Sequence, residues 1–227
     1  MSLILNIDTS TENAGIFLSS DGILFSSALN HRQNDQAAWI HTAINKLMQD
    51  AGYQMRDLKA VAVVAGPGSY TGLRVGMASA KGICYALDIP LIAENTLELM
   101  AANAIDQSQN HSIPQSAIFC PLIDARRMEV FTALYNSSLA ELLSPRALVL
   151  EDGSFEPWLT QTPVLFFGSG AAKWQQVCSH SHAYSEAVEF SGEQFVSRTY
   201  SKFLRNEFTV LAYAEPVYLK EFYTHPK

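Results

Sequence analysis

Residues 60–87, AVAVVAGPGSYTGLRVGMASAKGICYAL, contain the pattern that decides the fold. The valine-rich run at residues 61–64 is suited to a buried strand and is too short for a membrane span. Gly-Pro-Gly at residues 66–68 ends that strand, and Ser69 or Thr71 can cap the helix that follows. A glycine-rich turn before a helix N-terminus can bind an anion. The stretch therefore predicts a strand, a turn and a helix in an α/β domain.

The turn does not fit the common phosphate-binding motifs. A P-loop requires Gly-Lys-Ser/Thr after its four-residue spacer, but Gly72 is followed by Leu73. A Rossmann fingerprint requires its third glycine where this chain has Thr71. Both motifs are excluded by spacing.

The predicted helix has one face of very small residues. Gly72, Gly76 and Ala80 recur every four positions. An interior glycine costs about 0.5–1 kcal/mol relative to alanine, so we expect a close backbone approach to offset this cost. Two interpretations remain open, because the face can lie on the protein's own sheet or receive a helix of a partner.

Composition limits the classes of function. The chain has 227 residues, 48% of them hydrophobic, with a net charge of −7, which allows one large or two small domains and argues against binding nucleic acid alone. The N-terminus lacks a basic region and no membrane segment is evident, so we expect a cytoplasmic protein. Cys84, Cys120 and Cys178 are widely spaced, which favours reduced core residues over disulfides or a zinc site.

The same order of elements is expected twice along the chain. Each half has three strands, a helix, a strand and a helix, followed by a final helix. The polar segment 103–115 ends in Pro114 and predicts a boundary between domains 1–108 and 109–227. The expected strands are 3–7, 15–19, 23–29, 61–64, 91–93, 117–123, 130–135, 146–150 and 164–167. The expected helices are 35–48, the glycine-containing helix that follows Ser69 or Thr71, 96–106, 153–160, 171–178 and 193–206.

Two polar turns recur in corresponding places of the two halves. An aspartate ends the first strand of each half, at Asp8 and Asp124. A Gly-x-Gly follows the fourth strand, at residues 66–68 and 168–170. What repeats is the pattern of hydrophobic periodicity and of the turn residues that end each element, not the residues themselves.

This duplicated pattern resembles the actin, sugar-kinase and Hsp70 superfamily. The resemblance implies an α/β fold of two tandem ribonuclease-H-like (actin-like ATPase) domains, each a mixed five-stranded sheet with flanking helices. In that superfamily the aspartate turns and the Gly-x-Gly hold a nucleotide. Carried over, a vestigial nucleotide site would comprise Asp8, Thr9, Ser10, Asp124, Gly168, Ser169 and Gly170.

More narrowly, the chain resembles the TsaB (YeaZ) family over nearly its whole length. The most specific match is Ala-Gly-Pro-Gly-Ser-Tyr-Thr-Gly-Leu-Arg at residues 65–74. The other matches are Ile-Asp-Thr-Ser at 7–10, Ile-Asp-Ala-Arg at 123–126, Glu-Val-Phe at 129–131, Gly-Ser-Gly at 168–170 and Ala-Glu-Pro-Val-Tyr-Leu at 214–219.

The resemblance implies a non-catalytic scaffold of the complex that makes N6-threonylcarbamoyladenosine at position 37 of ANN-decoding tRNAs. It implies a TsaD-like catalytic subunit and a TsaE-like ATPase as partners, a homodimer when the protein is alone, and contact with tRNA only through the complex. No catalytic residue, metal or cofactor belongs to the chain itself, whereas ATP and a metal ion are implied for the partner complex. The implied partner interface uses first-domain helices, through Asp35, Trp39, Ala43, Gly72, Gly76 and Ala80. On this interpretation Gly76→Leu abolishes partner binding and leaves a folded monomer.

Two enzymatic alternatives remain. In a free-standing ATPase or kinase, Asp8 and Asp124 would act as general base and magnesium ligand, although an aspartate after a strand also caps turns. A glycoprotease-like peptidase is less favoured, because Ser69 is not in a Gly-x-Ser-x-Gly elbow. His180 and His182 lack an evident third metal ligand.

Two groups of basic residues could attract an anion. Arg198, Lys202 and Arg205 share a helical face that is either solvated or available to steer tRNA phosphates. Arg126 and Arg127 follow Asp124 in a turn that could offer them to an anion, but the resemblance gives Arg127 no role, since relatives more often have a small or apolar residue there.

Overall fold

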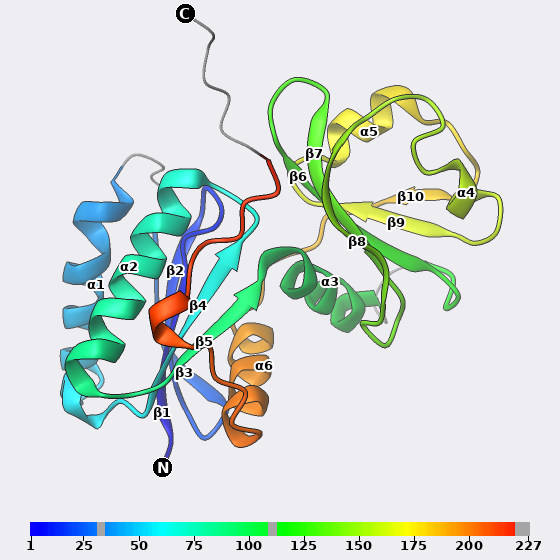
Figure 1. Ribbon diagram of the computed structural model, residues 1–227. Helices are drawn as coiled ribbons and strands as arrows, with labels where there is room; N and C mark the ends of the chain where they lie inside the picture. Colours follow the sequence, from blue (N-terminus) through cyan, green and yellow to red (C-terminus); the bar gives the residue numbers. More distant parts are fainter. Residues whose placement is uncertain (31–34, 109–112, 221–227) are drawn as a thin grey trace, which may run out of the picture. The chain divides into compact units, whose positions relative to one another are not determined.

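The computed structural model describes residues 1–30, 35–108 and 113–220 and divides the chain into two compact units (Figure 1). The first unit comprises Met1–Thr96 and Ser191–Val217, and the second comprises Leu97–Phe190 and Tyr218–Lys227. This division differs from the predicted boundary between residues 108 and 109, which adjoins residues outside the described part of the chain. The difference arises because the helix predicted at 96–106 packs in the second core, while the helix predicted at 193–206 packs on the first sheet.

The first unit is built on a five-stranded mixed sheet in the order β3-β2-β1-β4-β5. Strands β1 to β3 form an antiparallel meander, and β4 and β5 continue the sheet parallel to β1. The bounds are β1 Leu3–Asp8, β2 Ala14–Ser20, β3 Ile23–Asn30, β4 Ala60–Gly66 and β5 Leu91–Asn95. All residues of β1 and β4 are buried, as expected for central strands covered on both faces.

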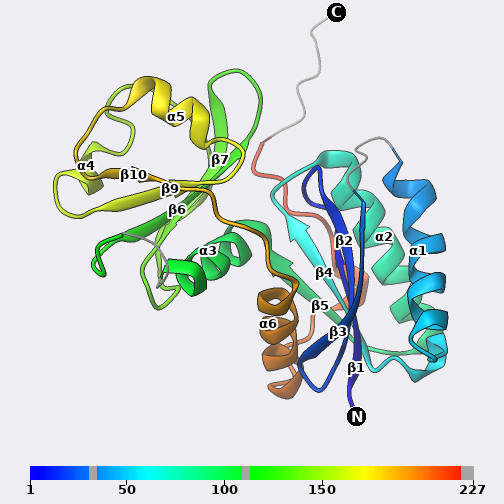
Figure 2. The same cartoon turned by 180° about the vertical axis from the view of Figure 1, so that it is seen from behind.

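Helices cover both faces of this sheet. Figures 1 and 2 show α1 (Gln36–Asp50) and α2 (Tyr70–Leu87) on one face and α6 (Gly192–Leu204) on the other. Side chains along β1 point alternately to the two faces of the sheet, and Leu5 and Ile7 join the core beneath α1 and α2. Asn6 points the other way and accepts a hydrogen bond from Thr199 of α6 at 2.6 Å.

The second unit repeats the architecture in the order β10-β9-β6-β7-β8. Its helix α3 packs against one apolar cluster of the sheet, and α4 and α5 pack against another. The bounds are α3 Thr96–Gln107, β6 Ile118–Asp124, β7 Glu129–Tyr135, β8 Glu141–Val149, α4 Glu156–Leu159, β9 Val164–Phe167, α5 Ala171–Val177 and β10 Ala183–Ser185. The predicted fold class, two mixed five-stranded sheets with flanking helices, is confirmed.

Some elements of the second unit differ from the prediction. Strand β8 begins at Glu141, five residues before the expected start, because Glu141 pairs with Tyr135 of β7. Strand β10 has three residues and was not predicted, because it is too short to show an alternating pattern. Helix α4 keeps only four residues of the expected 153–160.

Of the three basic residues predicted to share a face of the last helix, two pair with a buried carboxylate and one lies at the surface. The Glu94 side chain of β5 is fully buried and accepts ion pairs from Arg198 at 3.1 Å and Lys202 at 3.0 Å. These long side chains reach around α6 toward the sheet, so they are neither solvated nor available to phosphates. Arg205 pairs at the surface with Glu207.

The cysteines and the helices agree with an ordinary globular core. Cys84 and Cys120 are buried and Cys178 is half-buried, and all three are free thiols. Burial raises the pKa of the Cys84 thiol to about 11. In the described part of the chain, none of the helices combines the length and the apolar character that crossing a bilayer requires.

Candidate functional site

The first aspartate turn is closed by its own hydrogen bonds. Asp8 Oδ1 accepts from the Ser10 backbone N–H at 2.8 Å and from Ser10 Oγ at 2.7 Å. Burial raises the pKa of Asp8, and the bonds from Ser10 act in the opposite direction. Asp8, Thr9 and Ser10 are 5%, 0% and 1% exposed. A carboxyl group held in this way caps a turn, and solvent-borne ligands have almost no access to it.

The start of α2 packs directly on this turn. A Cβ on Gly68 would lie 2.2 Å from the Ser10 carbonyl oxygen, and a Cβ on Gly72 would lie 2.0 Å from the Thr9 carbonyl oxygen. Ser69 N–H donates to the Ser10 carbonyl at 2.7 Å, and Thr9 Oγ1 donates to the Gly72 carbonyl at 2.7 Å. The glycines of the 66–72 turn therefore allow two parts of the chain to meet, which explains them without a bound phosphate.

The second aspartate is neutralised by a lysine. Lys173 Nζ of α5 lies 2.7 Å from Asp124 Oδ1, and the Arg126 N–H donates to the same oxygen at 2.6 Å. Partial burial acts to raise the pKa of Asp124, but the Lys173 ammonium and the Arg126 amide lower it below its ordinary value. Asp124 Oδ1 is therefore occupied by a turn-capping amide and a lysine of the same unit, which gives this carboxylate a structural role.

The Gly168-Ser169-Gly170 turn lies beside Asp124 in the second unit. Ser169 Oγ accepts from the Asp124 N–H at 3.0 Å, and the Gly170 N–H donates to the Leu122 carbonyl at 2.8 Å. Gly168 has a φ of +96°, and a Cβ there would lie 2.6 Å from the same carbonyl oxygen. An open hollow of about 490 Å³ adjoins the turn, and Ser169, Gln175 and Glu186 are among its lining residues.

The predicted nucleotide residues thus form one group in each unit. Residues 8–10 meet the start of α2 in the first unit, and Asp124 meets residues 168–170 in the second. In each group the polar atoms described above are bonded within the chain.

The small-residue face predicted for partner binding lies against the protein's own sheet. Gly72, Gly76 and Ala80 are buried, and a Cβ on Gly76 would lie 2.3 Å from Thr9 Oγ1 and 3.5 Å from Val63 Cγ2. Ala43 is also part of this core. These four residues are therefore inaccessible in the folded chain, and Gly76→Leu is expected to disrupt the fold rather than leave an intact monomer.

The two remaining residues of that prediction lie nearer the surface. Asp35 is exposed at the N-terminus of α1, without a side-chain capping bond, and Trp39 is half-buried. They are reachable, but they do not form a continuous face with the buried glycines.

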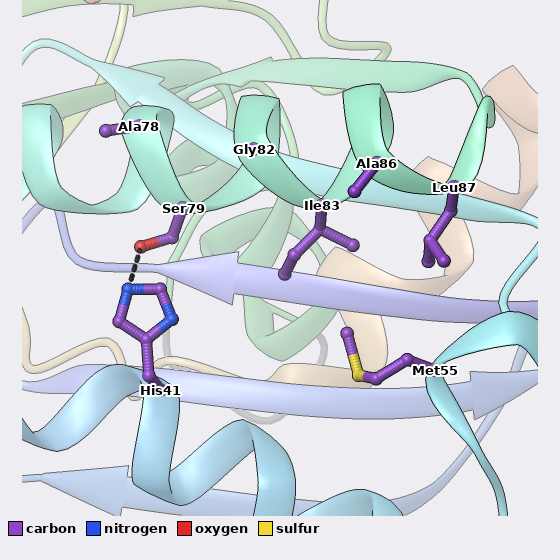
Figure 3. Close-up of a pocket in the computed structure, with 8 residues that line it drawn as sticks. All are labelled: His41, Met55, Ala78, Ser79, Gly82, Ile83, Ala86 and Leu87. Atoms are coloured by element: carbon purple, nitrogen blue, oxygen red, sulfur yellow. Dashed lines mark hydrogen bonds between the residues drawn. The ribbon is translucent and has the colours of Figure 1, made fainter.

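A second row of small residues on α2 faces an open groove (Figure 3). Ala78, Gly82 and Ala86 have the same four-residue spacing as the buried row, and a Cβ on Gly82 would meet nothing within 4 Å. The groove has a volume of about 420 Å³ and is lined mainly by apolar atoms of His41, Met55, Ala78, Ser79, Gly82, Ile83, Ala86 and Leu87. Figure 3 shows His41 of α1 reaching toward α2, where its Nε2 lies 3.4 Å from Ser79 Oγ.

Sequence reasoning missed this groove, although its signal was present. The spacing Ala78-x3-Gly82-x3-Ala86 is as regular as the spacing of the row that was chosen. Only the position of Thr9, more than sixty residues away in the chain, identifies which row faces inward.

The remaining catalytic candidates have structural roles. Ser69 caps α2 by accepting from the Gly72 N–H at 3.3 Å. His182 lies 2.8 Å from the Leu159 carbonyl through its Nδ1 and donates its backbone N–H to His180 Nδ1 at 3.1 Å. Within residues 1–30, 35–108 and 113–220, no cluster of three or more His, Cys, Asp or Glu side chains could hold a metal ion.

Comparisons with known proteins find relatives named for tRNA threonylcarbamoyladenosine biosynthesis. Residues 30–204 match the family described as "TsaD: tRNA N6-adenosine threonylcarbamoyltransferase". The "tRNA threonylcarbamoyladenosine biosynthesis protein TsaB" of Bacillus subtilis is 32% identical over 182 residues, covering 77% of this chain and 74% of that protein. The protein of the same name from Escherichia coli is 27% identical over 232 residues, covering 96% of this chain and 94% of that protein.

A solved structure shows the same fold. "YeaZ from Pseudomonas aeruginosa" superposes with a TM-score of 0.80 at 24% identity, covering 96% of this chain and 100% of that chain. Together with the family match and the Bacillus relative, these similarities show that the chain belongs to the TsaB (YeaZ) family.

Proposed function

We propose that this protein is a non-catalytic subunit in the biosynthesis of tRNA N6-threonylcarbamoyladenosine and that it binds a TsaD-like catalytic subunit. The observation that carries this proposal is the state of the two aspartates. Asp8 is buried and bonded to Ser10, and Asp124 is paired with Lys173. The residues that would perform nucleotide chemistry in related folds therefore serve the structure of this chain.

The α1–α2 groove is the proposed docking surface for the catalytic subunit. Small residues at a regular spacing allow the axis of a partner helix to approach α2 closely, and the apolar lining contributes burial of surface. In the absence of that subunit, the same groove would pair two copies of this chain. A TsaE-like ATPase, ATP and a metal ion would belong to the complete complex, and tRNA would bind only to the complex.

The decisive experiment is nucleoside mass spectrometry of bulk tRNA after depletion of this protein from its host. We expect loss of threonylcarbamoyladenosine and its restoration by the wild-type chain. Asp8→Asn should restore it equally, because an amide oxygen can still accept both Ser10 hydrogen bonds while the carboxylate is absent. An unchanged level of threonylcarbamoyladenosine after depletion would refute the proposal.

The same assay separates the groove from the rest of the surface. A Cβ on Gly82 meets nothing within 4 Å and points into the groove, so we expect Gly82→Trp to fold but to obstruct the groove and fail to restore the modification. Ser197→Trp is the matched control, because Ser197 is exposed on α6 across the sheet. Equal restoration by both variants would contradict docking at the groove.

Calorimetry of the isolated chain with ATP and magnesium tests the ATPase alternative. We expect no binding heat. Saturable heat that disappears in a folded Asp8→Asn or Asp124→Asn variant would favour a free-standing nucleotide site over the scaffold.

A further inference from the structure

The turn between β6 and β7 exposes two consecutive arginines. The turn is closed by the Ala125 N–H donating to the Glu129 carbonyl at 3.0 Å and by the Glu129 N–H donating to the Arg126 carbonyl at 3.0 Å. Arg126 and Arg127 are both exposed between these two bonds. Neither guanidinium group has a hydrogen-bond or ion-pair partner in the part of the chain that the structure describes.

Neighbouring carboxylates do not neutralise this pair. Asp124 lies against Lys173, and Glu129 is bound by Lys220. The lysines and the carboxylates therefore balance one another at the base of the turn, and the two guanidinium charges remain at its tip. This concentration of positive charge is unexpected on a chain whose net charge is −7.

The backbone of the turn is unfavourable for arginine. Arg126 and Arg127 have φ values of 70° and 48°, in the left-handed region that favours glycine and asparagine. The bond that Arg126 makes to Asp124 uses its backbone N–H, which almost any residue could supply. Among the described residues, neither arginine side chain makes a hydrogen bond or ion pair that could compensate for this backbone conformation, and such positions are candidates for function.

We infer that the Arg126–Arg127 turn binds the phosphate backbone of the RNA on which the complex acts. This inference rests on the proposed function. Guanidinium groups bind phosphates through two parallel hydrogen bonds, and they remain charged at every physiological pH. An exposed pair at a hairpin tip can follow a polyanion surface without enclosing a ligand.

A small nucleotide is a poorer fit to the same turn. The backbone N–H groups of Ala125, Arg126 and Glu129 are all bonded within the turn, so they form no nest for a terminal phosphate. The nearby hollow beside Ser169 is lined by neither arginine and contains the Glu186 carboxylate.

The test compares two full-length variants in the reconstituted complex with the TsaD-like subunit. Arg126→Asn with Arg127→Gly removes both charges and supplies the residues that this turn favours, so thermal stability should not fall. Arg146→Gln with Arg205→Gln is the control, because it removes the same charge from exposed sites elsewhere. Fluorescence anisotropy measures the affinity for unmodified tRNA between 50 and 200 mM salt.

We expect the turn variant to bind tRNA more weakly and with a shallower salt dependence. Each phosphate contact contributes about 0.7–0.9 to the slope of log K against log salt, so loss of two contacts reduces the slope by about 1.4–1.8. The control variant should keep the wild-type slope. Equal slopes for the turn variant and the wild type would overturn the inference.

Other results would identify a different ligand. If the turn variant no longer binds the TsaD-like subunit, and the complex that still forms at high protein concentration binds tRNA with wild-type affinity, the turn binds an acidic protein surface and the inference is wrong. If ATP binding alone is lost, the ligand is a nucleotide. Failure of the proposed function is recognised separately, because depletion of the protein would then leave tRNA modification unchanged.

Discussion

The two glycine rows of α2 predict opposite responses to the same substitution. Gly76→Ala places a methyl group 2.3 Å from Thr9 Oγ1, a contact that real side chains do not tolerate. Thr9 is fully buried and its hydroxyl bonds to the Gly72 carbonyl at 2.7 Å. Either this bond breaks, at about 1–3 kcal/mol, or α2 moves away from β4, at a similar overpacking cost of about 1–3 kcal/mol.

Helix propensity reduces this penalty but does not cancel it. Alanine is favoured over glycine in a helix interior by up to about 1 kcal/mol. We therefore expect Gly76→Ala to lower the free energy of unfolding of the first unit by roughly 1–2 kcal/mol. The added methyl group of Gly82→Ala meets nothing within 4 Å, so no clash offsets the higher helix propensity of alanine. This substitution should raise the free energy of unfolding by about 0.5–1 kcal/mol.

Urea unfolding followed by tryptophan fluorescence can measure both effects. Trp39 lies in the first unit, whereas Trp158 and Trp174 lie in the second, so a Trp158→Phe, Trp174→Phe background reports the first unit alone. The midpoints of the two variants should move in opposite directions at an unchanged m-value. A Gly76→Ala protein as stable as Gly82→Ala would refute the tight seating of α2 on the Thr9 turn.

Three further substitutions test the buried and paired charges. Because burial raises the pKa of Asp8, its neutral form stabilises the folded chain at acidic pH, and this stabilisation is lost as pH rises through the folded-state pKa. Asp8→Asn should therefore remove this pH dependence from the urea midpoint of unfolding. The variant should be no less stable than the wild type at pH 7. Glu94→Gln removes the buried carboxylate that pairs with Arg198 and Lys202 and should cost about 3–5 kcal/mol in urea unfolding, so an unchanged midpoint would contradict the buried ion pairs. Lys173→Gln should raise the pKa of the Asp124 carboxyl toward its ordinary value in an NMR titration, and an unchanged value would show that the lysine does not set it.

The sequence predicts the elements of this fold where the signal is local. The buried run at residues 61–64 and the Ser69 cap both depend on neighbours in the chain. Strand β10 and the early start of β8 depend instead on pairing with distant strands. The unit boundary has the same origin, because α6 follows the second unit in sequence but packs on the sheet of the first.

The candidate site was harder to predict because charge partners are long-range. A helical projection places Arg198 and Lys202 away from the apolar stripe of α6, so their pairing with Glu94 could not be read from that helix alone. Glu94 itself gives no signal in β5, since a glutamate in an edge strand is ordinarily solvated. Likewise, the spacing around Asp124 gives no indication that Lys173, almost fifty residues later, neutralises it.

The packing of α2 on the sheet connects the closed turn at residues 8–10 with the proposed docking groove. Gly68 and Gly72 let the start of α2 close over residues 8–10. The same contact fixes the rotation of α2, because Gly76 can approach Thr9 only when the Gly72, Gly76 and Ala80 row faces the sheet. With that row turned inward, Ala78, Gly82 and Ala86 necessarily line the groove beside His41. A substitution at Gly72 or Gly76 can therefore weaken partner binding without touching the partner, by rotating or lifting the helix that carries the docking surface.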